Sequence, residues 1–79
     1  MVPRYYFHVY NDETVLDEEG QEFPDATAAH NCAVKEARVL MTESVMKGHI
    51  VLSHHIRIED ADGAHVGNVT FGEAVTIRP

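Results

Sequence analysis

Aromatic and β-favouring side chains dominate the start of the chain, where residues 4–10 read Arg-Tyr-Tyr-Phe-His-Val-Tyr. This composition predicts a β-strand, in which alternate side chains share a face. The face expected to join the core consists of Tyr5, Phe7 and Val9. The opposite face consists of Arg4, Tyr6, His8 and Tyr10. A turn signal at residues 11–12 and an apolar run at 14–16 complete a predicted β-hairpin, and residues 21–23 follow as a short extended piece.

A long amphipathic helix is predicted between Asp25 and Gly48. Asp25 can accept hydrogen bonds from the first-turn N–H groups, and Gly48 suits the left-handed conformation that ends many helices. At about 100° per residue, one broad face is small and apolar and should pack on the sheet. It consists of Ala26, Ala29, His30, Ala33, Val34, Ala37, Leu40, Met41, Ser44 and Val45. A thinner apolar stripe lies nearly opposite and consists of Ala28, Cys32, Val39 and Met46.

A second hairpin is predicted after the helix. Two strand-like segments, 54–59 and 64–69, flank Asp60-Ala61-Asp62-Gly63, which fits a type I turn closed by a left-handed glycine bulge. That turn would pair Ile58 with Val66. The run Ile50-Val51-Leu52 is too apolar for a free loop and is expected to cross the edge of the core. Thr70 and Glu73 match a capping box, which predicts a short terminal helical turn.

These elements predict one α+β domain over residues 1–79, in the order β-β-α-β-β, with both hairpins in one antiparallel sheet and the helix on one face. A chain of 79 residues is too short for a second core. Domains of this size bury only about 60% of the surface that the unfolded chain exposes, and oligomerisation is a common way to add stability.

The net charge of −7 comes from a single segment. Residues 11–25 hold seven acids and no Lys or Arg, whereas the rest of the chain holds six acids and six bases. Such a segment repels phosphate backbones, and the bases are scattered, so we expect no binding to nucleic acid. The segment can attract a basic protein or a divalent cation, or it can be a solvated turn that keeps the protein soluble.

The chain carries no signature of membrane insertion or export. No apolar run approaches the roughly 18 residues of a membrane span, and the N-terminus has no signal-peptide pattern. Cys32 is the only cysteine, which excludes an intrachain disulfide. We therefore expect a cytoplasmic protein.

Candidate chemistry is sparse. Six histidines suggest metal binding, but His54 and His55 point to opposite strand faces and the helix separates His30 from His49. One cluster can form on the outer sheet face, from His8, His55 and His65. The Asp60–Gly63 turn lacks the required positions of a calcium loop. We predict no catalytic residue, no cofactor and no bound metal.

The segments Pro3–His8, Asp17–Asp25 and Phe71–Val75 together resemble a domain-of-unknown-function family of small proteins, found mostly in alphaproteobacteria. The resemblance covers nearly the whole chain. It departs at Asn11-Asp12, where the family has an Asp-Gly turn, and at Cys32, where an acidic residue is common. It implies a bacterial, cytoplasmic, stand-alone module and supplies no site. The layout alone is similar to antitoxins whose partial ribonuclease-H-like domain binds a small basic toxin.

The leading functional hypothesis is a non-enzymatic interaction module that forms a homodimer. An antitoxin-like binder of a basic protein is the alternative, and a small enzyme or metal protein is the third. Two surfaces are candidate interfaces: Tyr6, His8 and Tyr10 on the sheet, and the stripe of Ala28, Cys32, Val39 and Met46 on the helix. The sheet surface is favoured, because tyrosines cover large areas at modest entropy cost, whereas the stripe is thin and interrupted.

Overall fold

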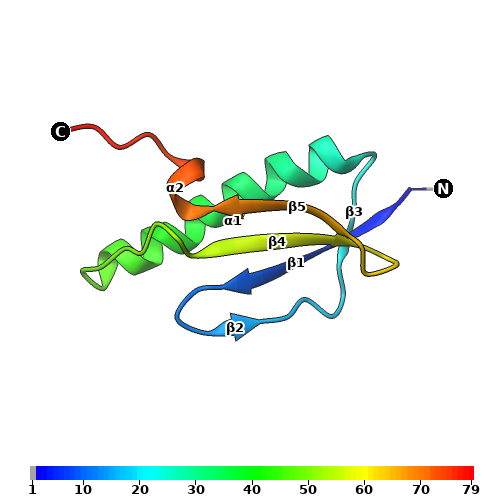
Figure 1. The fold of residues 1–79 in the computed structure, drawn as a ribbon, viewed down its shortest axis with the longest axis horizontal. Coiled ribbons are helices and arrows are strands. Elements are labelled where there is room, and N and C mark those ends of the chain that lie inside the picture. Colours follow the sequence, from blue (N-terminus) through cyan, green and yellow to red (C-terminus); the bar gives the residue numbers. More distant parts are fainter. Residues whose placement is uncertain (1) are drawn as a thin grey trace.

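The structure, a computed structural model, describes residues 2–79 as a curved sheet with a long helix on one face (Figure 1). In chain order the elements are β1 (Arg4–Tyr10), β2 (Thr14–Val15), β3 (Gln21–Glu22), α1 (Ala26–Met46), β4 (His55–Asp60), β5 (His65–Thr70) and α2 (Phe71–Ala74). The strands are antiparallel in the order β2-β1-β4-β5, and β3 also pairs with β1. The α+β prediction is confirmed, with residues 21–22 adding a short third strand.

Strand β1 has a continuous partner on one side and a broken one on the other. It pairs with β4 along its length from Tyr5 to Tyr10. On the other side, β2 pairs at Val9 and Tyr10, and β3 pairs at Arg4 and Tyr5. The N–H of Phe7 falls in the gap, where it donates to Asp17 Oδ2 at 3.1 Å. A side-chain carboxylate thus replaces the missing strand.

The core lies between α1 and the sheet. Ala29, Ala33 and Ala37 are fully buried, as predicted, and their small side chains let the helix approach the strands closely. The fully buried large side chains are Ile56, Ile58 and Val69 from the sheet and Phe71 from α2. Tyr5 is buried beside them, and Phe7 and Val9 pack partly against the same cluster. The predicted inner face of the first strand is confirmed.

Both ends of α1 lie where the sequence predicted them. Asp25 is the N-cap, and its Oδ1 accepts from the N–H of Ala28 at 2.8 Å. At the other end Gly48 has φ +88°, and its N–H donates to Val45 O. The N–H of His49 donates to Ser44 O, which completes a Schellman motif.

The second hairpin forms as predicted, except that the pairing of its strands differs by one residue. Gly63 has φ +82° at the turn, as predicted. However, Ile58 lies opposite Gly67 and not opposite Val66, because the register shifts by one residue between Ile58 and Glu59. Val66 is the additional residue of this bulge and is 36% exposed. Ile56 and Ile58 still point into the core.

The segment after α1 also differs from the prediction, because its apolar side chains are exposed. Ile50, Val51 and Leu52 are 41%, 37% and 42% exposed, so their side chains do not cross the core. Backbone contacts hold this segment, because the N–H of Gly72 donates to Leu52 O. The predicted capping box is present, with Thr70 and Glu73 bonded reciprocally at the start of α2. Neither helix within residues 2–79 is long and apolar enough to cross a membrane.

Candidate functional site

The outer face of the sheet is the first candidate surface. Figure 1 shows α1 behind the sheet, which leaves the opposite face without a covering layer. Tyr6, His8 and Tyr10 lie on this face, as predicted, and all three are half-buried. The ring of Tyr10 stacks on that of His55, with centroids 5.0 Å apart and an interplanar angle of 17°. The face is therefore already ordered by contacts within the chain.

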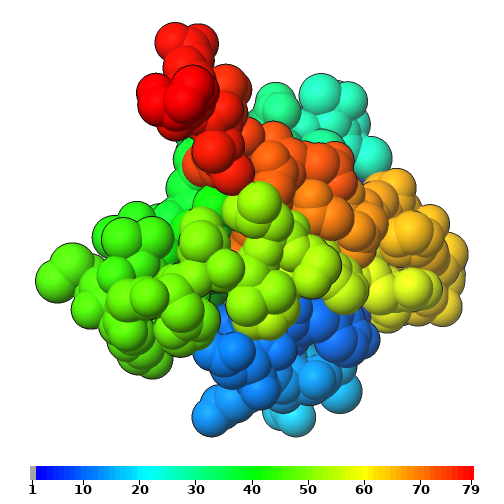
Figure 2. Space-filling model, turned by 60° about the vertical axis from the view of Figure 1, so that its left-hand side comes forward, coloured from blue at the N-terminus to red at the C-terminus, as the bar shows by residue number. Residues whose placement is uncertain are grey.

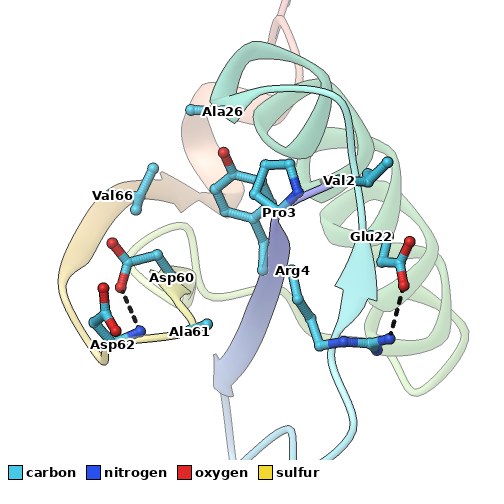
Figure 3. A pocket seen from close by; sticks show the side chains of 10 residues that line it. Val2, Pro3, Arg4, Glu22, Ala26, Asp60, Ala61, Asp62 and Val66 are labelled. Atoms are coloured by element: carbon cyan, nitrogen blue, oxygen red, sulfur yellow. Dashed lines mark hydrogen bonds and ion pairs between the residues drawn. The ribbon is translucent and has the colours of Figure 1, made fainter.

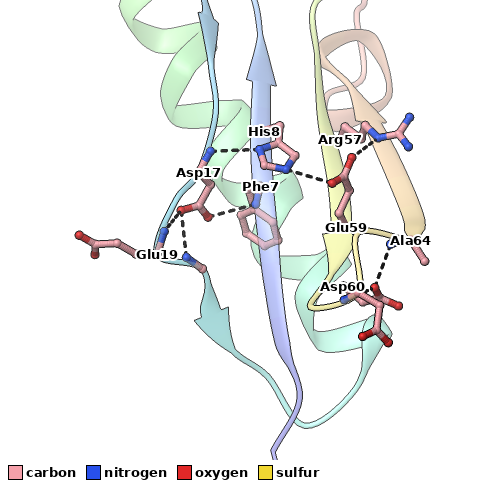
Figure 4. A network of polar contacts seen from close by, with 10 residues as sticks. Phe7, His8, Asp17, Glu19, Arg57, Glu59, Asp60 and Ala64 are labelled. Carbon is pink, nitrogen blue, oxygen red and sulfur yellow. Dashed lines mark hydrogen bonds and ion pairs between the residues drawn. The ribbon is translucent and has the colours of Figure 1, made fainter.

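A polar chain crosses this face from the loop after β2 to β4 (Figure 4). The backbone N–H of Asp17 donates to His8 Nδ1 at 3.0 Å. Because Nδ1 accepts, the proton of a neutral His8 lies on Nε2, which donates to Glu59 Oε1 at 3.2 Å. Arg57 Nε donates to the other oxygen of Glu59 at 2.6 Å. Both ring nitrogens of His8 are thus occupied.

The two carboxylates of this chain have lowered pKa values for identifiable reasons. Hydrogen bonding from Arg57 holds the pKa of Glu59 below its ordinary value, with a further contribution from His8. Partial burial opposes ionisation of Asp17, but backbone N–H donors at Gly20, Phe7 and Glu19 outweigh it and lower its pKa. Both groups act as charged hydrogen-bond acceptors, which is a structural role.

Exposed apolar side chains gather at a different place, the C-terminal end of α1. Among residues 2–79, eleven large apolar side chains are exposed. Seven of them come from the last turns of α1, the following loop and the C-terminal segment: Val39, Val45, Met46, Ile50, Val51, Leu52 and Ile77. We call these seven residues the apolar end. Figure 2 brings this end of the molecule forward, with residues 40–52 in green and the C-terminal segment in red.

Three residues of the apolar end, Val45, Met46 and Ile50, line a hollow of about 450 Å³. Its walls are formed by Arg38, Met41, Thr42, Val45, Met46, Ile50 and Val75. Arg38 is fixed there because its Nε donates to Ala74 O at 2.7 Å, which ties α1 to α2. The hollow is therefore built from both helices and the loop that follows α1.

Comparison with family models gives one match: a domain of unknown function, DUF6894, over residues 4–72. This range contains every strand and all of α1. The chain belongs to the DUF6894 family. No curated protein and no solved structure matches it.

The predicted helix stripe of this DUF6894 domain divides into two halves. Ala28 and Cys32 are half-buried and pack against the core, which corrects their assignment to an outer face. Val39 and Met46 are 56% and 83% exposed. Val39 is exposed because it lies on the outer face of α1, since Met41, two residues further on, is only 5% exposed. Met46 is the last residue of α1, where the helix extends past the ends of β4 and β5 (Figure 1). Burial and the nearby Glu36 raise the pKa of the Cys32 thiol, which disfavours the reactive thiolate.

The histidine arrangement that the sequence allowed on the outer sheet face, with His55 near His65, does not form in the DUF6894 domain. His55 lies opposite Thr70 and His65 opposite Glu59, at different ends of the hairpin. A contact that sequence reasoning missed lies elsewhere: Asp12 is 3.1 Å from His49 Nε2 and 3.9 Å from His54 Nε2. No local signal identifies it, because 37 residues separate Asp12 from His49. Within residues 2–79, no group of three or more His, Cys, Asp or Glu side chains is arranged to hold a metal ion.

Proposed function

We propose that this DUF6894 domain is a non-enzymatic, cytoplasmic interaction module that forms a homodimer through its apolar end. One observation carries the proposal: seven of the eleven exposed large apolar side chains come from the second half of α1 and the segments that follow it, and three of them, Val45, Met46 and Ile50, line one hollow. Large contiguous apolar surface on a small domain is typical of a contact site. Two members of the helix stripe, Val39 and Met46, belong to it.

The outer sheet face is the weaker candidate interface. His8, Glu59 and Arg57 on this face are hydrogen-bonded to one another, and the His8 side chain is only 14% exposed. A partner on this face would cover polar groups already bonded to one another and gain little apolar burial. By contrast, Met46 is 83% exposed, so its burial would remove apolar surface from water.

Light scattering on two matched variants tests the proposal. Val45 and Val15 are 58% and 53% exposed, but only Val45 belongs to the apolar end. Wild-type protein is expected to have about twice the 8.8 kDa mass of one chain, as an isologous dimer does. Val45→Glu should give a single-chain mass, because it places two charges in a twofold contact, whereas Val15→Glu should remain dimeric. A wild-type mass of one chain at micromolar concentration contradicts the proposal.

Binding of a basic protein is the second candidate function. Most of the acids in residues 11–25 follow Leu16, and the structure places that part of the chain at the same end of the molecule as the turn containing Asp60 and Asp62 (Figure 1). The acidic surface is therefore larger than the sequence segment alone. A native-host pull-down that returns a basic protein, lost at high salt, would favour this function over self-association.

A further inference from the structure

A hollow of about 700 Å³ opens at the end of the molecule opposite the apolar end. It lies where the start of β1, the first turn of α1 and the β4–β5 turn meet (Figure 3). Its apolar lining consists of Val2, Pro3, Tyr5, Ala26, Ala61 and Val66. Four charged residues complete the lining: Arg4, Glu22, Asp60 and Asp62.

Tyr5 places an unused polar group in this hollow. The residue is only 8% exposed, yet its hydroxyl has no hydrogen-bond partner among residues 2–79. No fully buried side-chain oxygen or nitrogen in that range lacks a partner, so the hydroxyl must be reachable from outside. Tyr5 is also one of the residues that line the hollow. Tyrosine hydroxyls in buried positions usually find a partner.

The charges around the hollow are unbalanced. Arg4 is already engaged, donating to Glu22 Oε1 at 3.2 Å and to Glu19 O at 2.9 Å. Asp60 uses Oδ1 to accept from the N–H groups of Asp62 and Ala64. Its second oxygen has no partner among the described residues, and neither does the carboxylate of Asp62. Figure 3 shows these two acids on one side of the hollow and the Arg4–Glu22 pair on the other.

We propose that this hollow binds a primary ammonium group carried on an apolar stem, the chemistry shared by a lysine side chain of a partner and a free alkylamine. An ammonium group has three N–H donors. Three acceptors on residues that line the hollow have no partner within residues 2–79: the Tyr5 hydroxyl, the second oxygen of Asp60 and the carboxylate of Asp62. The stem would lie against Pro3 and Val66. This site is independent of self-association through the apolar end.

The helix N-terminus beside the hollow does not oppose a cation. Ala26 begins α1, and a free helix N-terminus carries partial positive charge. Here the carboxylate of Asp25 caps that end, accepting from the N–H of Ala28. The local field is therefore set by Asp60 and Asp62, whose net charge is complementary to an ammonium group.

Chemical-shift titration of tag-free protein with four probes tests the proposal. The cationic probes are n-butylammonium and a blocked peptide containing one lysine, and the controls are n-butanol and butyrate at equal ionic strength. We expect saturable shifts at the amides of Ala26, Ala61 and Val66 with at least one cationic probe only. The responding probe identifies the source: peptide alone indicates a partner lysine, and butylammonium indicates a free amine. Shifts with butanol equal to those with butylammonium would overturn the proposal, as would no response to either cation.

Matched variants separate specific contact from general attraction. Asp62→Asn and Glu13→Gln remove the same charge, but Glu13 lies in the turn between β1 and β2, outside the hollow. Asp62→Asn should weaken the cationic probe at least about threefold, and Glu13→Gln should not. Tyr5→Phe should also weaken binding while leaving the denaturant midpoint unchanged, since the hydroxyl has no partner in the free protein. Equal weakening by Asp62→Asn and Glu13→Gln would reduce the effect to net charge and refute the site.

Discussion

The two ends of the molecule satisfy their backbone hydrogen-bonding groups by different means. At the end that holds the hollow lined by Tyr5, Asp60 and Asp62, side chains satisfy the backbone: Asp25 accepts an N–H group at the start of α1, and Asp60 accepts N–H groups in the β4–β5 turn. At the apolar end, the backbone satisfies itself through the Schellman motif after Met46. Its side chains are left exposed.

This difference shows how to interpret the charge of the chain. Several acids of residues 11–25 have structural roles within the monomer, so their presence alone does not require a ligand. The unused acceptors are more informative, and they occur beside the hollow at Asp60 and Asp62. At the opposite end the exposed apolar side chains are not used in packing within residues 2–79, which is why we propose that a second copy covers them.

Two glycines at positive φ give the largest expected contrast between the ends. A Cβ on Gly20 would lie 2.8 Å from Tyr6 Cε2 and 2.9 Å from Tyr5 O, whereas a Cβ on Gly48 would meet nothing within 4 Å. Gly20→Ala should therefore cost about 3 kcal/mol of unfolding free energy, and Gly48→Ala only about 1 kcal/mol for its backbone conformation. Urea denaturation measures both. Equal losses would show that crowding at Gly20 is relieved.

Asp17 provides the next largest effect, and it depends on pH. Its carboxylate accepts from the N–H groups of Phe7, Glu19 and Gly20, so Asp17→Asn should cost about 1–2 kcal/mol at neutral pH. Since the folded pKa is depressed, this stabilisation is fully present above the ordinary value of 3.8 and is lost as pH falls through the folded pKa.

Unfolding curves between about pH 7 and pH 2 check the Asp17 prediction. The gap between wild type and Asp17→Asn should narrow once the pH falls below 3.8. Glu13→Gln is the control, because the Glu13 side chain has no hydrogen bond among the described residues. A gap that stays constant to the lowest pH would contradict the role given to ionised Asp17.

Local signals in the sequence predict most of the fold. Asp25 and Gly48 fix the bounds of α1, and Thr70 with Glu73 fixes the start of α2, because caps are hydrogen bonds between residues a few positions apart. The paired strands follow from alternation and turn residues. By contrast, the bulge at Val66 could not be predicted, because nothing in the alternating pattern marks a shift of one residue.

The candidate surfaces depend on non-local geometry and were only partly predictable. Alternation placed Tyr6, His8 and Tyr10 correctly, but not the bonds that satisfy His8 from Asp17 and Glu59. The helix wheel treated Cys32 and Met46 alike, although one packs on the core and the other extends past the sheet. The position at which a helix extends beyond its sheet depends on the strand lengths and on the angle between helix and strands. A helical wheel contains neither quantity.

The two ends of α1 should respond differently to loss of their capping side chains. Asp25→Ala removes the acceptor for the N–H of Ala28 and should cost about 1 kcal/mol. Lys47→Ala should change the unfolding free energy by less than about 0.5 kcal/mol, because the C-terminal cap uses only backbone groups. Thermal denaturation compares them directly. A larger loss for Lys47→Ala would show that the Lys47 side chain also stabilises the C-terminal end of α1.

Met46→Gln should have the smallest effect on the monomer and the clearest effect on the dimer. At 83% exposure, Met46 contributes little packing within one chain, so at low protein concentration the variant and wild type should differ by less than about 0.5 kcal/mol. If two copies meet at the apolar end, the midpoint of wild-type unfolding must rise with protein concentration, because association stabilises only the folded state. The polar Gln should reduce that concentration dependence. Urea unfolding at about 1 μM and about 100 μM measures both quantities, and the same change at Val15, Val15→Gln, controls for loss of an exposed apolar side chain elsewhere. A loss of stability by Met46→Gln at the lower concentration would instead place Met46 in the packing of the single chain.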